Sequence, residues 1–163
     1  MTKDLRRIES ALEKLSRMGR SRRSDAIRCA RAGVHLPRAA QQVLRHTVEQ
    51  GPSRISDLVR ATMTDDAAVS RQVTALEREG LVSREGSPED GRVSMVSATA
   101  RGRRVQKKLR AAADEIFREH MVDWSARDLS RLAEYLERLA GDLRDTPRAS
   151  RSVAAKAGAT GSV

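Results

Sequence analysis

The sequence predicts a mainly helical protein that carries one small β-hairpin. Apolar residues recur at steps of three and four towards both ends of the chain, as they do on the buried face of a helix. Two β-prone runs, LVSRE and RVSMVSA, are separated by the turn-forming residues GSPEDG. Only Phe117, Trp124 and Tyr135 are aromatic among 163 residues, so aliphatic side chains must form the core, which suits packed helices.

Residues 1–35 are expected to form a helical segment. Its apolar stripe consists of Leu5, Ile8, Leu12 and Leu15. Gly19 and Ser21 weaken this pattern, so either one long helix bends there or two helices meet. Gly33 is a natural stop, because glycine readily adopts the left-handed conformation that ends helices.

Residues 36–103 begin with three more predicted helices. Pro37 suits the first position of a helix that carries Val43, Leu44 and Val48 and ends at Gly51-Pro52. Ser56 is expected to cap the next helix, which carries Leu58 and Val59. Thr64 is expected to cap the third, with Asp65 and Asp66 in its first turn, where carboxylates are favourable.

The third of these helices has two distinct faces. Val69, Val73 and Leu76 share the side that is expected to pack inward. The opposite side carries Ala67, Ser70, Arg71, Thr74 and Arg78. Short polar side chains with an arginine fork are typical of a helix that enters the major groove of DNA, and Arg71 is the first candidate for a base contact.

Gly80 is expected to end that helix, and the two β-prone runs that follow predict a hairpin. Helix, turn, helix and hairpin together make the winged helix-turn-helix plan. Arg92, just past the hairpin tip, is placed to enter the minor groove, with Asp90 close enough to hold it. Arg84, towards the end of the first strand, is a candidate for a phosphate contact.

These residues also carry a resemblance to a known family. Three segments are similar in order and spacing to the MarR family of bacterial regulators. They are VSRQVTALEREGLVSRE at 69–85, the triplet Asp90-Gly91-Arg92, which looks like the family's Asp-x-Arg wing motif, and SATARG at 97–102. The resemblance spans roughly residues 4–145. It implies a minor-groove role for Arg92, a salt bridge from Asp90, and places for Ser70 and Arg71 on the recognition helix. Many members have a second arginine where this chain has Gly91, so a wing-tip phosphate contact is not expected.

Residues 104–145 are expected to form a second helical segment. Thr99 should cap a helix whose buried side carries Val105, Leu109, Ala112, Ile116 and Met121. Ser125 and Asp128 resemble a capping box that opens a last helix. That helix carries a leucine seam of Leu129, Leu132, Leu136, Leu139 and Leu143. Periodicity alone leaves open whether the seam lies in the core or in a dimer interface, and the resemblance favours a dimer. The tail, 146–163, has no apolar period and is expected to be disordered.

The charge of the chain favours a polyanionic partner but does not locate a site. The net charge is +10, yet residues 53–103 carry eight basic and eight acidic groups, whereas residues 1–31 carry ten and four. DNA affinity must therefore come from the placement of a few arginines.

Several other kinds of site are not expected. Cys29 is a single cysteine without a neighbouring His or second Cys, so a small buried residue is favoured over an oxidant sensor. The three histidines lack metal-ligand spacing, and we see no paired carboxylates, phosphate loop or nucleophile elbow, so we expect no metal, no cofactor and no enzyme. No apolar run approaches the ~20 residues of a membrane helix, and we expect a cytoplasmic protein.

The leading hypothesis is a homodimeric transcriptional regulator, most simply a repressor, that binds a pseudo-palindromic operator in double-stranded DNA. The resemblance implies that a small phenolic or otherwise lipophilic ligand can release it, and Leu36, Met63, Phe117 and Trp124 are candidates to line the ligand site. Two alternatives stay open. One is a sequence-indifferent DNA-packaging protein, and the other is a helical dimeric scaffold whose winged module contacts protein.

Overall fold

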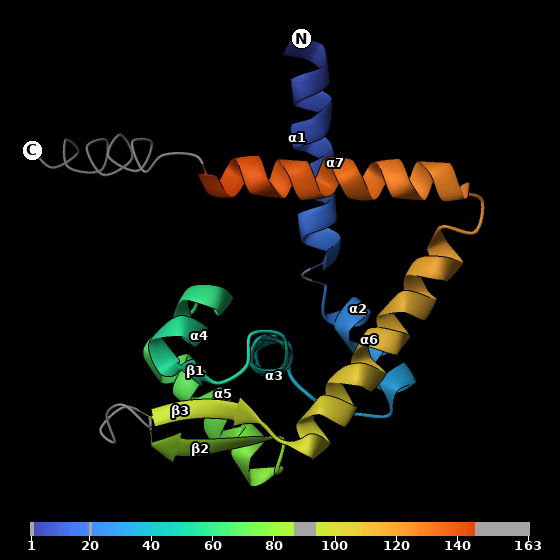
Figure 1. Ribbon diagram of the computed structural model, residues 1–163. Helices are drawn as coiled ribbons and strands as arrows, with labels where there is room; N and C mark the ends of the chain where they lie inside the picture. Colours follow the sequence, from blue (N-terminus) through green and yellow to red (C-terminus); the bar gives the residue numbers. More distant parts are fainter. Residues whose placement is uncertain (1, 20, 87–93, 146–163) are drawn as a thin grey trace, which may run out of the picture. The chain divides into compact units, whose positions relative to one another are not determined.

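The computed structural model describes residues 2–19, 21–86 and 94–145 and confirms a mainly helical fold with a small sheet (Figure 1). In chain order the elements are α1 (Thr2–Gly19), α2 (Arg22–Ala32), α3 (Arg38–Glu49), β1 (Ser53–Arg54), α4 (Ile55–Thr62), α5 (Asp66–Arg78), β2 (Val82–Gly86), β3 (Ser94–Ala98), α6 (Ala100–His120) and α7 (Ala126–Asp145). The chain divides into two units, 1–120 and 121–163. The predicted tail, 146–163, lies outside the described residues. No helix among those described is long and apolar enough to cross a membrane.

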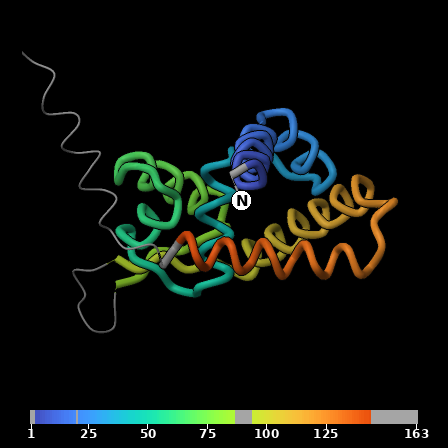
Figure 2. The backbone as a smooth tube through the Cα atoms, turned by 90° about the horizontal axis from the view of Figure 1, so that it is seen from above, coloured from blue at the N-terminus to red at the C-terminus, as the bar shows by residue number. Residues whose placement is uncertain are grey.

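The break near Gly19 separates two helices, which decides between the two alternatives for the first segment. α1 ends at Gly19, and α2 begins at Arg22 after Ser21, whose backbone is extended. Gly33 ends α2 as predicted, with φ at 62°, and its N–H donates to the carbonyl of Ala30 over 3.1 Å. α2 then lies beside α6 (Figure 2).

An exposed ion pair joins these two helices. Arg31 donates two hydrogen bonds to the carboxylate of Glu119, of 2.6 and 2.7 Å. The hydrogen bonds from Arg31 lower the pKa of the Glu119 carboxyl, and the same bonds raise the pKa of Arg31. Because the pair faces solvent, it sets the register of α2 on α6 more than it adds stability.

Three predicted helix starts were each wrong by one or two residues. Pro37 precedes α3 instead of occupying its first position. Ser56 lies inside α4, where the backbone N–H of Arg54 donates to the carboxylate of Asp57 over 3.2 Å. Asp65, not Thr64, caps α5, and its carboxylate accepts from the N–H of Ala68 over 2.7 Å. A carboxylate also gains from the positive end of the helix dipole, which a threonine hydroxyl does not.

The hairpin belongs to a three-stranded antiparallel sheet in the order β1-β3-β2. β2 and β3 pair from Val82 opposite Ala98 to Gly86 opposite Ser94, so the predicted hairpin is confirmed (Figure 1). β1 was not predicted. It has two residues and pairs only with β3, with Ser53 opposite Val96. So short a strand shows no alternation along the sequence.

One aliphatic core holds the helix-turn-helix, the sheet and α6 together. Its most completely buried side chains include Leu44 from α3, Leu58 from α4, Leu76 from α5 and Val96 from β3. Leu109 and Ala112 of α6 are buried as predicted, whereas Val105, Ile116 and Met121 are only half-buried. Phe117 is exposed. The recognition helix candidate α5 is thus held in place by packing against α3, α4 and β2.

The junction between β3 and α6 is closed by backbone contacts. Thr99 caps α6 as predicted, because its hydroxyl accepts from the N–H of Gly102 over 3.0 Å. The same hydroxyl donates to the carbonyl of Gly80 over 2.7 Å, and the N–H of Thr99 donates to the carbonyl of Leu81 over 3.0 Å. Gly102 is buried, and a Cβ there would overlap the Leu81 carbonyl oxygen and lie 3.1 Å from Cδ1 of Leu44. The start of α6 therefore rests directly on Gly80 and Leu81, the residues that link α5 to β2.

The leucines of α1 and α7 stay at the surface of the chain. In α1 the exposed fractions are 58% for Leu5, 48% for Ile8 and 57% for Leu15. In α7 Leu136 is 44% and Leu143 64% exposed. Ser125 caps α7 as predicted, since its hydroxyl accepts from the N–H of Asp128 over 3.2 Å. The other half of the predicted capping box differs, because it is the Ser125 hydroxyl that donates to the Asp128 carboxylate, over 2.6 Å.

Met63 occupies the turn between α4 and α5 in a conformation that favours glycine. Its φ is 52°, and its side chain is 91% exposed, so packing does not offset the backbone strain. We expect Met63→Gly to raise the free energy of unfolding by about 0.5 to 1 kcal/mol. Glycine relieves the backbone strain of the folded state, and its greater conformational entropy in the unfolded state offsets part of that gain. Urea unfolding measures the change. Ala61→Gly, at an exposed position inside α4, is the matched control and should lower stability by about 1 kcal/mol. A lower midpoint for Met63→Gly contradicts the strain.

Candidate nucleic-acid interface

α5 presents one buried and one exposed face, as the sequence predicts. Val69, Val73 and Leu76 are at most 1% exposed. On the other face Ala67, Arg71 and Arg78 are exposed, whereas Ser70 and Thr74 are half-buried. Arg71 thus extends from the middle of a helix whose own position is fixed by its buried side. The side chain is free to reach a base edge while the backbone stays in place.

Ser70 and Thr74 are half-buried because Arg84 crosses them from β2. Its Nη2 donates to Oγ1 of Thr74 over 2.8 Å and lies 3.3 Å from the carbonyl oxygen of Ser70. Its Nε lies 3.3 Å from the carboxylate of Glu77. One guanidinium from the hairpin therefore contacts three residues on successive turns of α5. The predicted phosphate contact of Arg84 remains a prediction, but the structure gives the side chain a second role, which is to hold the hairpin against the helix.

Five of the predicted residues come together around one shallow depression, which is lined by Ser70, Arg71, Thr74, Ala75, Arg78 and Arg84. Ala67 lies one turn before it on the same helix face. Asp90 and Arg92 lie outside the described residues, so their wing roles stay predictions. The sequence reasoning missed Glu77. Its opposite charge to Arg84 across the turn at Gly80 was the available signal.

The contacts of Arg84 lead to a prediction that separates positioning from phosphate binding. We expect Arg84→Ala and Arg84→Lys to lose similar stability, about 1 kcal/mol, because lysine keeps the charge but lacks the fork that reaches Thr74 and Glu77 together. Thermal unfolding and a double-mutant cycle with Glu77→Ala measure this. If Arg84→Lys is as stable as the wild type and Glu77 shows no coupling, the positioning role is wrong.

A second cavity lies within residues 1–120, between α2, α3 and α6. It has a volume of about 300 Å³, and we call it the arginine-rich cavity because four arginines and two carboxylates line it, together with Leu109 and Phe117. The charged residues are Arg28, Arg38, Arg45, Arg110, Glu49 and Asp114. The Nε atom of Arg28 is buried and makes no hydrogen bond. The Nη2 atom of the same guanidinium pairs with the carboxylate of Asp25 over 2.5 Å, so Nε is the donor that an acceptor in the cavity could use.

The predicted ligand residues of the first unit do not all line the arginine-rich cavity. Leu36 is buried in the core, and Met63 is 91% exposed in the turn, so the ligand roles of both stay predictions. Phe117 does line the arginine-rich cavity. Trp124 belongs to the second unit.

Cys29 is buried, as expected for a small core residue. Its Sγ lies 3.1 Å from Nε2 of Gln41, and that amide also donates to the carbonyl of Leu36 over 2.8 Å. Within the described part of the chain, no group of three or more His, Cys, Asp or Glu residues is arranged to hold a metal ion.

Comparison with known proteins agrees with this geometry. The MarR family model matches residues 36–93, which include α5 and β2. An uncharacterised HTH-type transcriptional regulator of Bacillus subtilis, YxaD, is 31% identical over 105 residues, which cover 64% of this chain and 73% of YxaD.

Solved structures show the same similarity. A probable transcriptional regulator from Pseudomonas aeruginosa is 30% identical, with a TM-score of 0.61, and the match covers 81% of this chain and 96% of that one. A MarR family protein from Bacillus stearothermophilus shares the fold, with 17% identity and a TM-score of 0.71 over 86% of this chain and 98% of its own. The family model, the relative and the two structures agree with the helix-turn-helix and hairpin found here, and the chain belongs to the MarR family of transcriptional regulators.

Proposed function

We propose that this DNA-binding regulator is a homodimer that reads a pseudo-palindromic operator and represses transcription from the promoter it covers. In this proposal α5, about residues 65–79, enters the major groove, and the hairpin, about residues 81–98, reaches the minor groove through Arg92. The observation that carries it is the placement of Arg71 and Arg78 on the exposed face of a helix whose other face is fully buried. Such a helix can enter a groove without losing its own packing.

The exposed leucines of α1 and α7 support the dimer. A stripe that repeats every three to four residues and remains about half exposed needs a partner surface, because contiguous apolar patches of this kind mark interfaces. A second copy of the chain supplies the same stripe by symmetry. Two recognition helices would then stand about one DNA turn apart.

A small ligand that releases the DNA is the second part of the proposal. The arginine-rich cavity between α2, α3 and α6 supports it, with Leu109 and Phe117 as its apolar wall and the unpaired Nε of Arg28 as a donor. DNA binding of the structural neighbour BpsR from Bordetella bronchiseptica, 24% identical with a TM-score of 0.51 over 64% of this chain, is regulated by 6-hydroxynicotinic acid. An aromatic acid of this kind would pair its carboxylate with arginine and its ring with Phe117.

Selection of binding sites from random duplexes by the full chain, followed by titration, tests the function. A regulator enriches one inverted-repeat sequence and binds it far more tightly than random DNA, with a strong salt dependence. Equal affinity for every duplex would favour the DNA-packaging alternative. No binding at low salt would favour the protein scaffold.

A further inference from the structure

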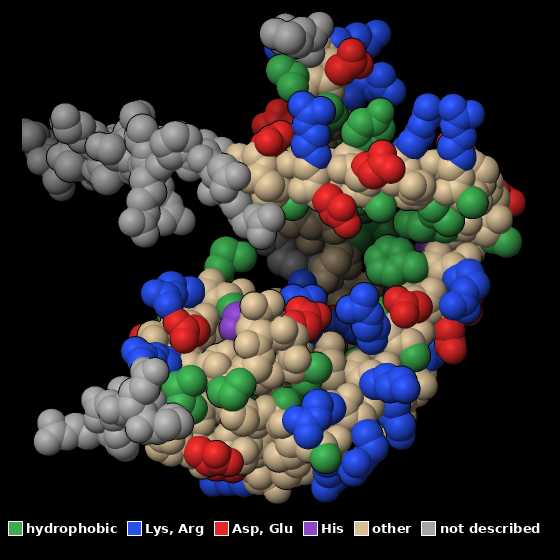
Figure 3. Space-filling model, in the orientation of Figure 1, with side chains coloured by type: hydrophobic (Ala, Val, Ile, Leu, Met, Phe, Trp, Pro, Cys, Tyr) green, Lys and Arg blue, Asp and Glu red, His purple; other side chains and the backbone are tan. Residues whose placement is uncertain are grey.

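The first half of α6 concentrates positive charge, of which the fold itself uses Arg103, whose guanidinium donates to the carbonyl of Ala98 over 2.7 Å. Residues 101–110 carry six basic side chains, Arg101, Arg103, Arg104, Lys107, Lys108 and Arg110, and no carboxylate. Figure 3 shows Lys and Arg side chains gathered along this part of the molecule, at the lower right. The helix bears its first carboxylates only at Asp114 and Glu115.

This order of charges opposes the helix dipole. The amino end of a helix is its positive end, so cations there are unfavourable and carboxylates are favourable. α6 has no acidic residue in its first turn. Helix stability therefore does not account for the basic residues, and an external anion would both balance them and satisfy the positive end of the helix.

Three of the cations lie on one side of α6 and reach the end of α5. Arg101, Arg104 and Lys108 follow one another at steps of three and four, so they share a face, and all three are exposed. With His35 and Glu79 they line a depression at the surface. Among the described residues that line it, Glu79 is the one carboxylate. None of the ion pairs within the described part of the chain involves these three cations.

This depression and the one around Arg71 are linked through neighbouring residues, because Glu79 lines the first and Arg78 lines the second. Glu79 is the residue that follows α5, and the hydrogen bond from the Thr99 hydroxyl to the carbonyl of Gly80 fixes the first turn of α6 against that end of the helix. The close approach of Gly102 to Leu81 fixes it further. The start of α6, which bears these cations, is therefore held against Gly80 and Leu81, two residues beyond Arg78, the last residue of α5.

We propose that Arg101, Arg104 and Lys108 form a phosphate-binding patch that contacts the backbone of the same DNA duplex whose bases α5 reads. The inference rests on the proposed function and adds a contact that neither the recognition helix nor the hairpin supplies. Three exposed cations beside one carboxylate match the spaced single charges of a DNA backbone. Contacts of this kind add affinity and set orientation without reading the sequence.

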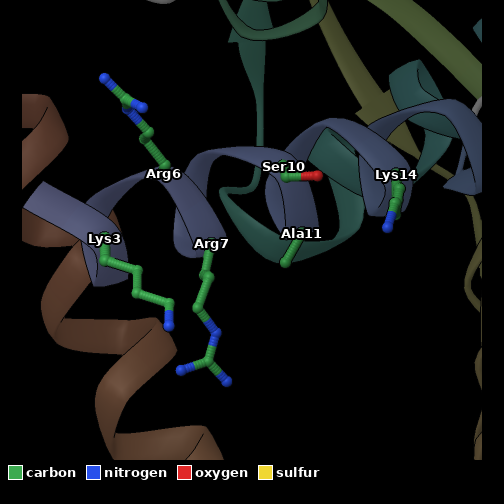
Figure 4. Close-up of a pocket in the computed structure, with 6 residues that line it drawn as sticks. All are labelled: Lys3, Arg6, Arg7, Ser10, Ala11 and Lys14. Atoms are coloured by element: carbon green, nitrogen blue, oxygen red, sulfur yellow. The ribbon is translucent and has the colours of Figure 1, made fainter.

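The test compares two triple variants of the full chain on the operator selected by the wild type and on a random duplex. The first is Arg101→Ala/Arg104→Ala/Lys108→Ala. The control, Lys3→Ala/Arg6→Ala/Lys14→Ala, removes the same charge from α1. Figure 4 shows these three side chains on α1, and they lie on the face opposite Leu5, Ile8 and Leu12. Circular dichroism and sedimentation verify that both variants keep the fold and the oligomeric state of the wild type.

We expect the patch variant to reduce the slope of log affinity against log salt by about 2 to 3 on both duplexes, about one per lost phosphate contact. The ratio between operator and random DNA should stay constant, and the α1 control should keep the wild-type slope. An unchanged slope for the patch variant, or an equal loss in the control, overturns the proposal. A changed operator-to-random ratio also overturns it. If the wild type itself selects no sequence, the proposed function fails, whereas the slope on random DNA still tests the patch.

Discussion

Gly102→Ala is expected to lower the free energy of unfolding by about 3 kcal/mol. The added methyl group would overlap the carbonyl oxygen of Leu81 and approach Cδ1 of Leu44 to 3.1 Å. Neither neighbour can move easily, because Leu44 is fully buried and the Leu81 carbonyl already accepts from the N–H of Thr99. The start of α6 must therefore shift away from Leu81, and the contacts of Thr99 with Gly80 and Leu81 should weaken with it.

Chemical unfolding of Gly102→Ala and Gly141→Ala measures this effect against a matched control. Gly141 also lies inside a helix, but a Cβ there meets nothing within 4 Å, and the residue faces away from the leucine seam of α7. Alanine at 141 should stabilise the chain by up to about 1 kcal/mol through helix propensity alone. Equal stability of the two variants would show that α6 does not rest on Leu81.

Leu12→Asp is expected to convert the dimer to a monomer at micromolar concentration. Leu12 lies in the middle of the apolar stripe of α1 and is 36% exposed in the single chain. In each copy of a dimer the substitution removes the about 1.5 to 3 kcal/mol that burial of one leucine contributes to association. The two copies together lose roughly 3 to 6 kcal/mol, before the cost of burying a carboxylate is added. That corresponds to at least ~100-fold weaker dimerisation.

Sedimentation equilibrium of Leu12→Asp and Ser10→Asp provides the measurement. Ser10 lies on the basic face of α1 beside Arg6 and Lys14, so the same new charge there should leave the dimer intact. A wild-type chain that is monomeric at these concentrations contradicts the dimer. So does a Leu12→Asp chain that associates as tightly as the wild type.

Local patterns predicted most of the elements but not the contacts between them. Three predictions depend on residues within one or two helical turns of each other, and all three agree with the structure. They are the buried face of α5, the end of α2 at Gly33 and the cap of α6 at Thr99. β1 was missed because its two residues are a strand only through pairing with β3, more than 40 positions later.

Long-range contacts account for what the sequence left unpredicted at the candidate site. Arg84 reads as a free surface arginine, since nothing local shows that it folds back onto Thr74 and Glu77. In the sequence, Gly102 looks like a residue that destabilises a helix. Only the structure shows that the absence of a side chain at Gly102 lets α6 approach the backbone of Leu81. The exposed leucines of α1 and α7 were ambiguous in the sequence, because periodicity shows that a face is apolar but not what covers it.

The central claim is that α5 reads bases through Arg71. The most direct test is a competition binding assay that compares the wild type with Arg71→Ala. The competitors are all single-base variants of the selected operator. Arg127→Ala, an exposed arginine on α7, is the matched control. We predict that Arg71→Ala loses about 1 to 3 kcal/mol of discrimination at one position in each half-site and keeps the others, whereas the control keeps them all. A uniform loss of affinity with every base preference intact would show that Arg71 contacts only phosphate and would contradict the claim.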